Sequence, residues 1–214
     1  MRTLIVAAHM DDEALSCGGL IQTRIKQGYD VHVMVPYGRS YSYGKMYGVD
    51  QVKEGENFSA AKEVLGYKKS YLLGLREGEP YQVGYYVILK HLEKYLKVCP
   101  FDEVVIPSDR DLNQDHRFLN DVCKIALRPA NLRGVKRILQ WRAFDTDLVR
   151  PNYYIPLSAR QFAVKMKAIN CYTREARVEP HPRAPSNIKA LHKVYGSYCG
   201  AALAEGFDLI FSKE

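Results

Sequence analysis

Short apolar runs alternate with amphipathic segments along most of the chain, and this alternation constrains the fold more than any other feature. The apolar runs predict buried strands at 3–8, 30–38, 70–75, 101–108 and 136–143. The segments between them have the apolar spacing of helices, at 13–28, 51–67, 85–99 and 114–128. Strands and helices in this order predict an α/β fold, a mostly parallel sheet with helices on both faces.

The pattern loosens after residue 145. Residues 151–157 predict an edge strand, 158–173 a helix, and 186–207 a second helical stretch interrupted by glycines. The proline-rich segment 177–186 predicts a loop. A length of 214 residues suits one domain. We therefore expect a single domain over residues 1–214, with the part from about residue 146 completing the mouth of the site.

The chain is basic, with a net charge of +7, which favours anionic partners or a merely basic surface. The basic segment 131–142 and the tyrosine-rich segment 37–48 suggest nucleic-acid binding as an alternative, but no RNA-binding motif supports it. We therefore predict a small-molecule partner and no nucleic acid. His91 and His192, which have charged neighbours on predicted helices, are expected at the surface.

The five cysteines argue for a reducing compartment. Their number is odd, their spacing is wide and no CxxC pair occurs, which argues against a disulfide framework and against a cysteine-type zinc site. The first apolar run is too short for a signal peptide, and no other run is long enough to span a membrane. These features predict a cytoplasmic protein without a membrane span.

Ionisable side chains gather where two of the predicted strands end. The sequence HMDDE, residues 9–13, follows the first strand, and SDRDLNQDH, residues 108–116, follows the fourth. In open α/β sheets, ligands bind at the carboxyl ends of the strands. The two clusters can therefore meet at one edge of the sheet.

A divalent metal ion would explain why so many ionisable groups lie near a core. His9 and Asp12 can reach one ion, with His116 as a third ligand and water in the fourth position, as in catalytic zinc sites. Asp11 can then act as general base, and Asp115 can orient a ligand or the base. The alternatives are that Asp12 caps a helix and that His116 is a capping or surface histidine.

Several stretches resemble the PIG-L/LmbE-like N-acetylglucosaminyl deacetylase family. AHMDDE, residues 8–13, resembles the family's AHPDDE signature, and DLNQDHRFLND, residues 111–121, lies where the family has a D-x-H-x-D-H element. Three further stretches match in order: 55–66, 153–173 and 181–207. The resemblance covers nearly the whole chain.

The resemblance implies a zinc-dependent hydrolase on a Rossmann-like fold that removes an acyl group, usually acetyl, from the nitrogen of an amino sugar. The metal ligands would be His9, Asp12 and His116, and Asp11 would activate water for direct attack on the amide. The substrate would be an N-acetylglucosamine type of sugar or conjugate, and the positive net charge favours an anionic one, such as a phosphorylated or nucleotide-linked form. Iron, cobalt or manganese can also occupy such a site.

The sequence departs from the family pattern at three positions. Met10 replaces a proline that supplies no side-chain chemistry. Asn113 stands where the family commonly has a histidine that helps protonate the leaving amine or hold the oxyanion; asparagine can donate a hydrogen bond but cannot deliver a proton as imidazolium does. Lys53 lies near a family arginine, and keeps its charge but loses the bidentate fork.

Two segments are candidates for substrate binding. The segment 37–48, with Arg39 and Tyr41, offers glycines for movement and tyrosine rings for a sugar, unless it is a plain surface loop. His181 and Arg183 lie in a proline-flanked loop, where Arg183 can hold an anionic group. Alternative functions are hydrolysis of an N-formyl sugar or an acylated natural-product precursor, or metal and sugar binding without catalysis. A homo-oligomer is compatible with the sequence.

Overall fold

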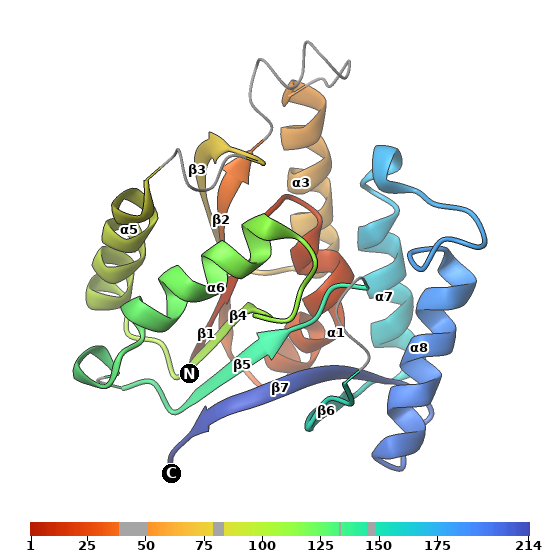
Figure 1. Cartoon of the computed structure of the whole chain (residues 1–214). Helices are drawn as coiled ribbons and strands as arrows, with labels where there is room; N and C mark the ends of the chain where they lie inside the picture. The colour runs from red at the N-terminus through yellow and green to blue at the C-terminus, as the bar shows by residue number, and fades with distance from the viewer. Residues whose placement is uncertain (39–50, 79–83, 133, 145–148) are drawn as a thin grey trace.

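A computed structural model describes residues 1–38, 51–78, 84–132, 134–144 and 149–214. In these residues seven strands form one sheet in the order β3-β2-β1-β4-β5-β7-β6 (Figure 1). The strands are β1 Arg2–Val6, β2 Asp30–Gly38, β3 Lys69–Arg76, β4 Glu103–Pro107, β5 Arg137–Trp141, β6 Tyr153–Pro156 and β7 Ala204–Ser212. The α-helices are α1 Asp12–Lys26, α3 Gln51–Leu65, α5 Tyr85–Val98, α6 Gln114–Ala126, α7 Ala159–Ile169 and α8 Pro185–Tyr198. Two short 3₁₀ helices are η1 Pro129–Asn131 and η2 Thr173–Glu175.

The first five strands are parallel, so their carboxyl ends lie at one edge of the sheet. In β1, Ile5 pairs with Val33 of β2 on one side and Val105 of β4 on the other. Strand β7 is antiparallel to both β5 and β6, and β6 forms the edge, as 151–157 predicts. The prediction of a mostly parallel α/β sheet is confirmed.

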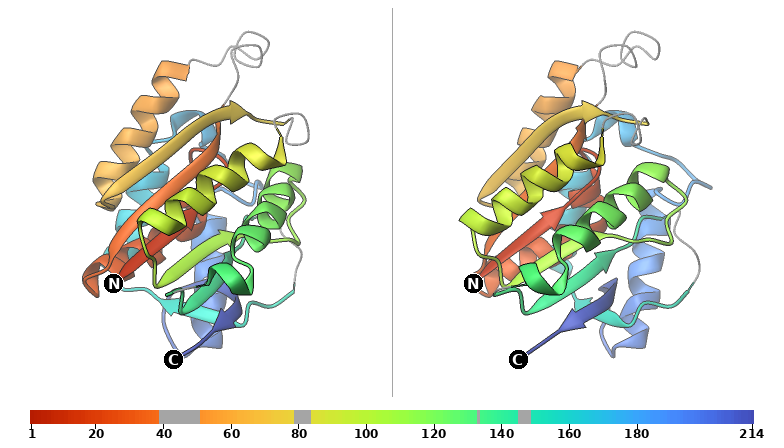
Figure 2. Two further views of the ribbon diagram at one scale, coloured as in Figure 1. Left: turned by 90° about the vertical axis from the view of Figure 1, so that its left-hand side faces the viewer. Right: turned by 60° about the vertical axis from the view of Figure 1, so that its left-hand side comes forward.

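The sheet is covered on both faces, and residues of β1 and the residue that follows it alternate between two apolar cores. Ile5 and Ala7 contact the core beneath α1, α3 and α7, whereas Leu4 and Val6 contact the core beneath α5 and α6. Figure 2 shows α5 and α6 in front of the strands, with α7 and α8 behind them. Buried strands with apolar residues on both faces are typical of parallel sheets.

The expected helical stretch at 186–207 is wrong in its second half. Helix α8 ends at Tyr198, and Gly200 adopts a positive φ of 72° that reverses the chain. The residues from Ala204 onward form β7, where Phe207 is fully buried between β5 and β6. The alternation of Phe207, Leu209 and Phe211 has the period of a strand, which the preceding helical spacing obscured.

A buried charge cluster connects α1, α7, α8 and β7. The Lys165 ammonium lies 2.6 Å from Glu205 Oε1 and 3.0 Å from His192 Nε2. The Glu205 carboxylate also accepts hydrogen bonds from the backbone N–H groups of Gly19 at 2.7 Å and Leu20 at 2.6 Å. β7 is thereby attached to the middle of α1 through a carboxylate.

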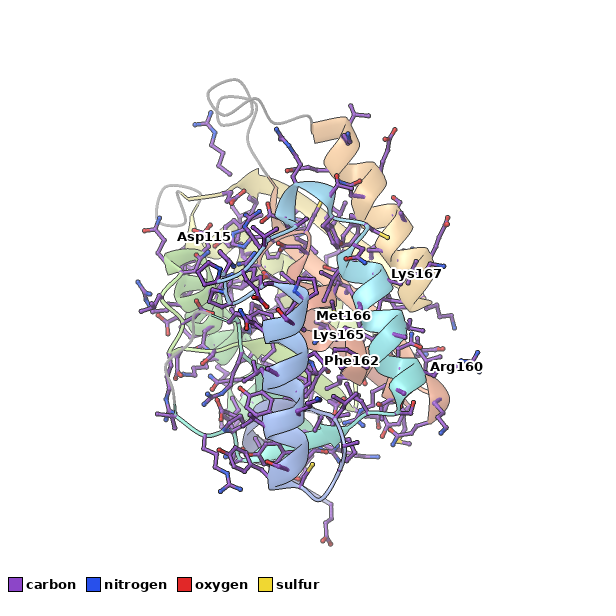
Figure 3. All side chains as sticks on the ribbon, turned by 90° about the vertical axis from the view of Figure 1, so that its right-hand side faces the viewer. Asp115, Arg160, Phe162, Lys165, Met166 and Lys167 are labelled. Atoms are coloured by element: carbon purple, nitrogen blue, oxygen red, sulfur yellow. The ribbon has the colours of Figure 1, made fainter. Side chains whose placement is uncertain are left out.

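His192 is buried, so its predicted surface position is wrong. In Figure 3, Lys165 and Phe162 lie on the side of α7 that faces α8, and Arg160 and Lys167 lie on the other side. The ring of His192 packs edge-on against Phe162, and its Nδ1 lies 2.7 Å from the Ile188 carbonyl oxygen. Burial and the nearby Lys165 ammonium lower the pKa of His192 to about 2, so its ring is neutral.

No helix in the described ranges is long and apolar enough to cross a membrane.

Candidate metal centre and its pocket

The turn that follows β1 holds the HMDDE residues in an unusual backbone conformation. Asp11, at the N-terminus of α1, has a φ of 146°, in a region that favours glycine. Its backbone N–H donates to Glu13 Oε2 at 3.2 Å, and Glu13 in turn accepts the Tyr172 hydroxyl at 2.5 Å. Buried Glu13 therefore holds the backbone of a strained turn at the start of α1.

Three ligand-type atoms converge after β1 and at the start of α6. Asp12 Oδ2 lies 3.5 Å from His9 Nδ1 and 3.4 Å from His116 Nε2, and the two nitrogens are 3.3 Å apart. Tetrahedral zinc with bonds of about 2.1 Å separates its ligand atoms by roughly 3.4 Å. The three atoms therefore fit three corners of a tetrahedral metal site, and His9, Asp12 and His116 lie together as the sequence predicts.

The other nitrogen of each histidine ring faces a carboxylate. His9 Nε2 lies 3.0 Å from Asp115 Oδ2, which also accepts the Gly78 N–H at 2.8 Å. His116 Nδ1 forms an ion pair with Asp111 Oδ2 at 2.9 Å. Such carboxylates orient metal-binding histidines and make them more basic.

Trp141 packs against the ring of His116. The two ring centroids are 5.0 Å apart, with the rings edge to face. The Trp141 indole N–H is held by the Val6 carbonyl oxygen at 2.8 Å. The last residue of β5 thus supports a candidate ligand and is attached to the end of β1.

The protonation of the centre reflects an excess of carboxylates. Burial disfavours the charged histidines, but Asp115 and Asp12 raise the pKa of His9 well above 6.5. Burial acts likewise on His116, and Asp12 and Asp111 raise its pKa to about 9. Burial would raise the pKa of Asp12, but His116 and His9 hold it well below its usual value. The carboxylates that make the two histidines bind protons firmly also favour a dication that displaces those protons.

Asp11 lies beside the three ligand atoms rather than among them. Its Oδ2 is 3.4 Å from Arg183 Nη1, and Arg183 Nη1 is 3.6 Å from Glu175 Oε2. Burial, followed by the Asp12 carboxylate, raises the pKa of Asp11 well above 3.8. A buried carboxylate with a raised pKa is suited to accept and return a proton.

The side chains of His9, Asp11, Asp12 and His116 line a cavity of about 230 Å³. Its lining includes the acidic residues Glu54, Glu77 and Glu175 in addition to Asp11 and Asp12. Arginines enter it from residues 174–183, namely Arg174, Arg177 and Arg183. Residues of the segment after residue 146 thus contribute to the lining of this cavity.

Of the other predicted site residues that the structure describes, only some line the cavity. Asn113, His181 and Arg183 line the cavity. Lys53 is exposed on α3, whose Glu54 and Asn57 line the cavity instead. Arg39 and Tyr41 lie outside the described residues. The catalytic function predicted for Asn113 and the substrate-binding functions predicted for the other residues stay predictions.

Sequence reasoning missed several residues of the centre. Asp111 belongs to the cluster 108–116, and its partner His116 five positions later was the available signal. Tyr172, Trp141 and Gly78 gave no signal, because their contacts join segments that are distant in the sequence.

Solved structures with the same fold include deacetylases and a hydratase. N,N′-diacetylchitobiose deacetylase from Pyrococcus horikoshii, in complex with an inhibitor, has a TM-score of 0.79 at 20% identity, covering 98% of this chain and 83% of that chain. The 4-carboxy-2-hydroxymuconate hydratase from Pseudomonas putida KT2440 has a TM-score of 0.78 at 18% identity, covering 100% and 98%. The zinc inhibited form of a teicoplanin deacetylase has a TM-score of 0.76 at 12% identity, covering 100% of both chains.

No curated protein matches the sequence. The family model PIG-L, described as GlcNAc-PI de-N-acetylase, matches residues 4–127. This match spans more than half of the chain and includes His9, Asp12 and His116. The chain therefore belongs to the PIG-L family.

Proposed function

We propose that this protein is a metal-dependent hydrolase that removes the N-acetyl group from an amino sugar or sugar conjugate. The observation that carries the proposal is the convergence of His9, Asp12 and His116 at distances of 3.3 to 3.5 Å, with Asp11 in the same cavity. Membership of the PIG-L family and the deacetylases among the structures of the same fold support it.

The three donors would hold zinc or another divalent metal such as iron, cobalt or manganese. A bound dication supplies a Lewis acid that favours deprotonation of water and polarises the amide carbonyl. Asp11 takes the proton of the attacking water and returns it to the leaving nitrogen as the C–N bond breaks. Asp115 and Asp111 hold the two imidazoles in the orientation that leaves His9 Nδ1 and His116 Nε2 facing the metal site.

The proposed substrate is an N-acetylglucosamine type of sugar with an anionic group. Arg183 would bind that group or orient Asp11, and His181 lies in the same cavity. The five cysteines are unpaired, which supports our proposal that the protein works in the cytoplasm. We also propose that residues 1–214 act as one domain.

Three other functions are tested in parallel. The same residues can hydrolyse another N-acyl group, such as an N-formyl sugar or an acylated natural-product precursor. The hydratase of the same fold suggests water addition to a carbon–carbon double bond. A protein that binds metal and sugar without catalysis is the third, because Asn113 replaces a histidine of the family pattern.

The test is release of acetate and formate from a panel of N-acylated amino sugars, in free, phosphorylated and nucleotide-linked forms. The metal-depleted protein is reloaded separately with zinc, iron, cobalt and manganese, because one structure of this fold is a zinc inhibited form. Release of acetate that a chelator abolishes supports the proposal, and the sugar of the panel that is hydrolysed fastest identifies the substrate class. A metal-loaded protein that hydrolyses no member, while it hydrates an unsaturated acid or binds a sugar unchanged, contradicts it.

Two variants test the functions proposed for Asp11 and His116. We expect Asp11→Asn to keep its metal and to lower kcat by about 10²–10⁴-fold, because the general base is lost. We expect His116→Ala to weaken metal binding by more than about 100-fold, since loss of an outer partner alone costs about 10–100-fold. The matched control is Asp109→Asn, an exposed carboxylate paired with Lys124. Equal metal content in His116→Ala and the unmodified protein would remove His116 from the ligand set.

A further inference from the structure

The side chain of Asn113 is committed to a helix cap. Its Oδ1 accepts the backbone N–H of Asp115 at 2.8 Å and so begins α6. Only the amide NH₂ group remains for the cavity, and this group donates hydrogen bonds but does not transfer protons. Asn113 can therefore supply only part of what the family histidine supplies, and a further donor in this chain would complete the stabilisation of an oxyanion.

His181 lies in the same cavity and comes from a different segment of the chain. Its main chain is held at both ends: His181 N–H donates to the Val178 carbonyl oxygen at 3.1 Å, and the Ala184 N–H donates to the His181 carbonyl oxygen at 2.8 Å. The Asn187 side-chain amide donates to the same carbonyl oxygen at 3.0 Å. This position is therefore well fixed before α8 begins.

The tautomer of His181 follows from one hydrogen bond. The backbone N–H of Arg183 donates to His181 Nδ1 at 3.0 Å. A ring nitrogen that accepts a hydrogen bond carries no proton, so the proton of the neutral imidazole is on Nε2. The backbone thus selects the form of His181 that offers an N–H donor from Nε2.

We propose that His181 is a catalytic residue whose neutral Nε2–H donates a hydrogen bond to the oxyanion formed from the substrate carbonyl. This inference rests on the proposed hydrolysis. When the water oxygen bonds to the carbonyl carbon, the C=O π electrons move to the carbonyl oxygen, and the water proton goes to Asp11. His181 Nε2–H stabilises the negative oxygen and keeps its own proton. When C=O re-forms, the C–N electron pair goes to nitrogen, which takes the proton from Asp11, and the products are a carboxylic acid and an amine.

A fixed neutral donor suits this step because it needs no reorganisation as charge develops. Removal of one such donor from an acyl-transfer site lowers kcat by about 10²–10³-fold. The interaction strengthens as the carbonyl oxygen gains charge, so the effect is on kcat more than on KM. His181 thereby supplies an interaction that Asn113, in place of a family histidine, supplies at most in part.

The first experiment is ¹⁵N NMR of the metal-loaded protein labelled at histidine. Its six histidines are assigned by single substitution. We expect the signals of His181 to show a protonated Nε2 and an unprotonated Nδ1. A proton on Nδ1 would overturn the inference whatever the substrate is.

The second experiment compares His181→Ala and His181→Gln on the best substrate of the panel. Glutamine can place an N–H donor near the position of Nε2, so we expect it to recover at least about tenfold of an approximately 100-fold loss of kcat in the alanine variant. The metal content and KM of both His181 variants should stay close to those of the unmodified protein. The control is His91→Gln, at an exposed position, which should change neither kcat nor KM. If the unmodified protein is active and His181→Ala has the same kcat, the role of His181 is overturned and the proposed function stands. An unmodified protein inactive on the whole panel would overturn the proposed function itself.

Discussion

At the scale of a single residue, the backbone of Asp11 is strained at the position that carries the proposed general base. Among the described residues, Asp11 is the non-glycine residue with a positive φ, at 146°. A residue held in such a region costs about 1–3 kcal/mol and persists only where its surroundings enforce it. Here the enforcing contact is the hydrogen bond to buried Glu13.

The strain predicts different stabilities for two substitutions that both remove the Asp11 carboxylate. Glycine adopts this φ without a Cβ, whereas alanine keeps the strain. We expect Asp11→Gly to be more stable than Asp11→Ala by at least about 1 kcal/mol, measured by urea unfolding at equal metal loading. Equal stability of the two variants would contradict a strained turn. Both should lack activity, because both lack the proposed base.

At the scale of an element, α1 is both the support of the site and the partner of β7. Its first residue, Asp12, accepts the backbone N–H groups of Ala8 at 3.1 Å and His9 at 2.9 Å. Its middle donates two backbone N–H groups to Glu205. Close approach of Glu205 is possible because residue 19 is glycine: a Cβ there would lie 2.8 Å from the Glu205 carboxyl carbon.

Two helical glycines form a matched test of this packing. A Cβ at Gly19 would also lie 2.5 Å from a methyl carbon of Leu157, so we expect Gly19→Ala to lose about 1–3 kcal/mol of unfolding free energy. A Cβ at Gly55 of α3 has nothing within 4 Å, so we expect Gly55→Ala to gain up to about 1 kcal/mol from helix propensity. Denaturant unfolding measures both. A Gly19→Ala protein as stable as Gly55→Ala would contradict the close contact of α1 with β7.

At the scale of the whole molecule, buried His192 makes stability depend on pH. Its pKa falls from 6.5 to about 2 on folding, chiefly through burial and then Lys165. Between these values the unfolded chain binds a proton that the folded protein does not. Stability therefore falls as pH falls below about 6.5, by up to about 1 kcal/mol per pH unit.

The measurement is the unfolding free energy between about pH 6.5 and pH 4.5. We expect His192→Gln to show a shallower decline than the unmodified protein, because the substitution removes one titrating group and the other groups are shared. His91→Gln, at an exposed position, is the control and should keep the full slope. Parallel declines in the His192→Gln and unmodified proteins would show that His192 is accessible to protons.

The sequence predicts those features that depend on local periodicity and on strand ends. The alternation of apolar runs indicates the parallel sheet, and the placement of residues 9–13 and 108–116 at strand ends brings His9 and His116 together. Both signals lie in short windows of the chain, where spacing alone determines which face a residue occupies.

What the sequence could not predict depends on contacts between distant segments. Lys165 and Glu205 are 40 positions apart, and a lysine on an amphipathic helix is normally exposed. His192 was expected at the surface because its neighbour Lys193 is charged, yet only the packing of α8 on α7 decides which face is buried. Strand β7 was missed for the same reason, because its alternation follows directly on a helical pattern.

The position of β7 within the sheet also sets an order of events during synthesis. All of the residues proposed to bind metal have been synthesised once residue 116 is added, whereas Glu205 is added almost ninety positions later. A nascent chain that has emerged to residue 170 presents His9, Asp12 and His116 without β7 against β5 and without Glu205 against α1. A ribosome that pauses late in translation would thus expose the side chains proposed to bind metal on an unfinished sheet.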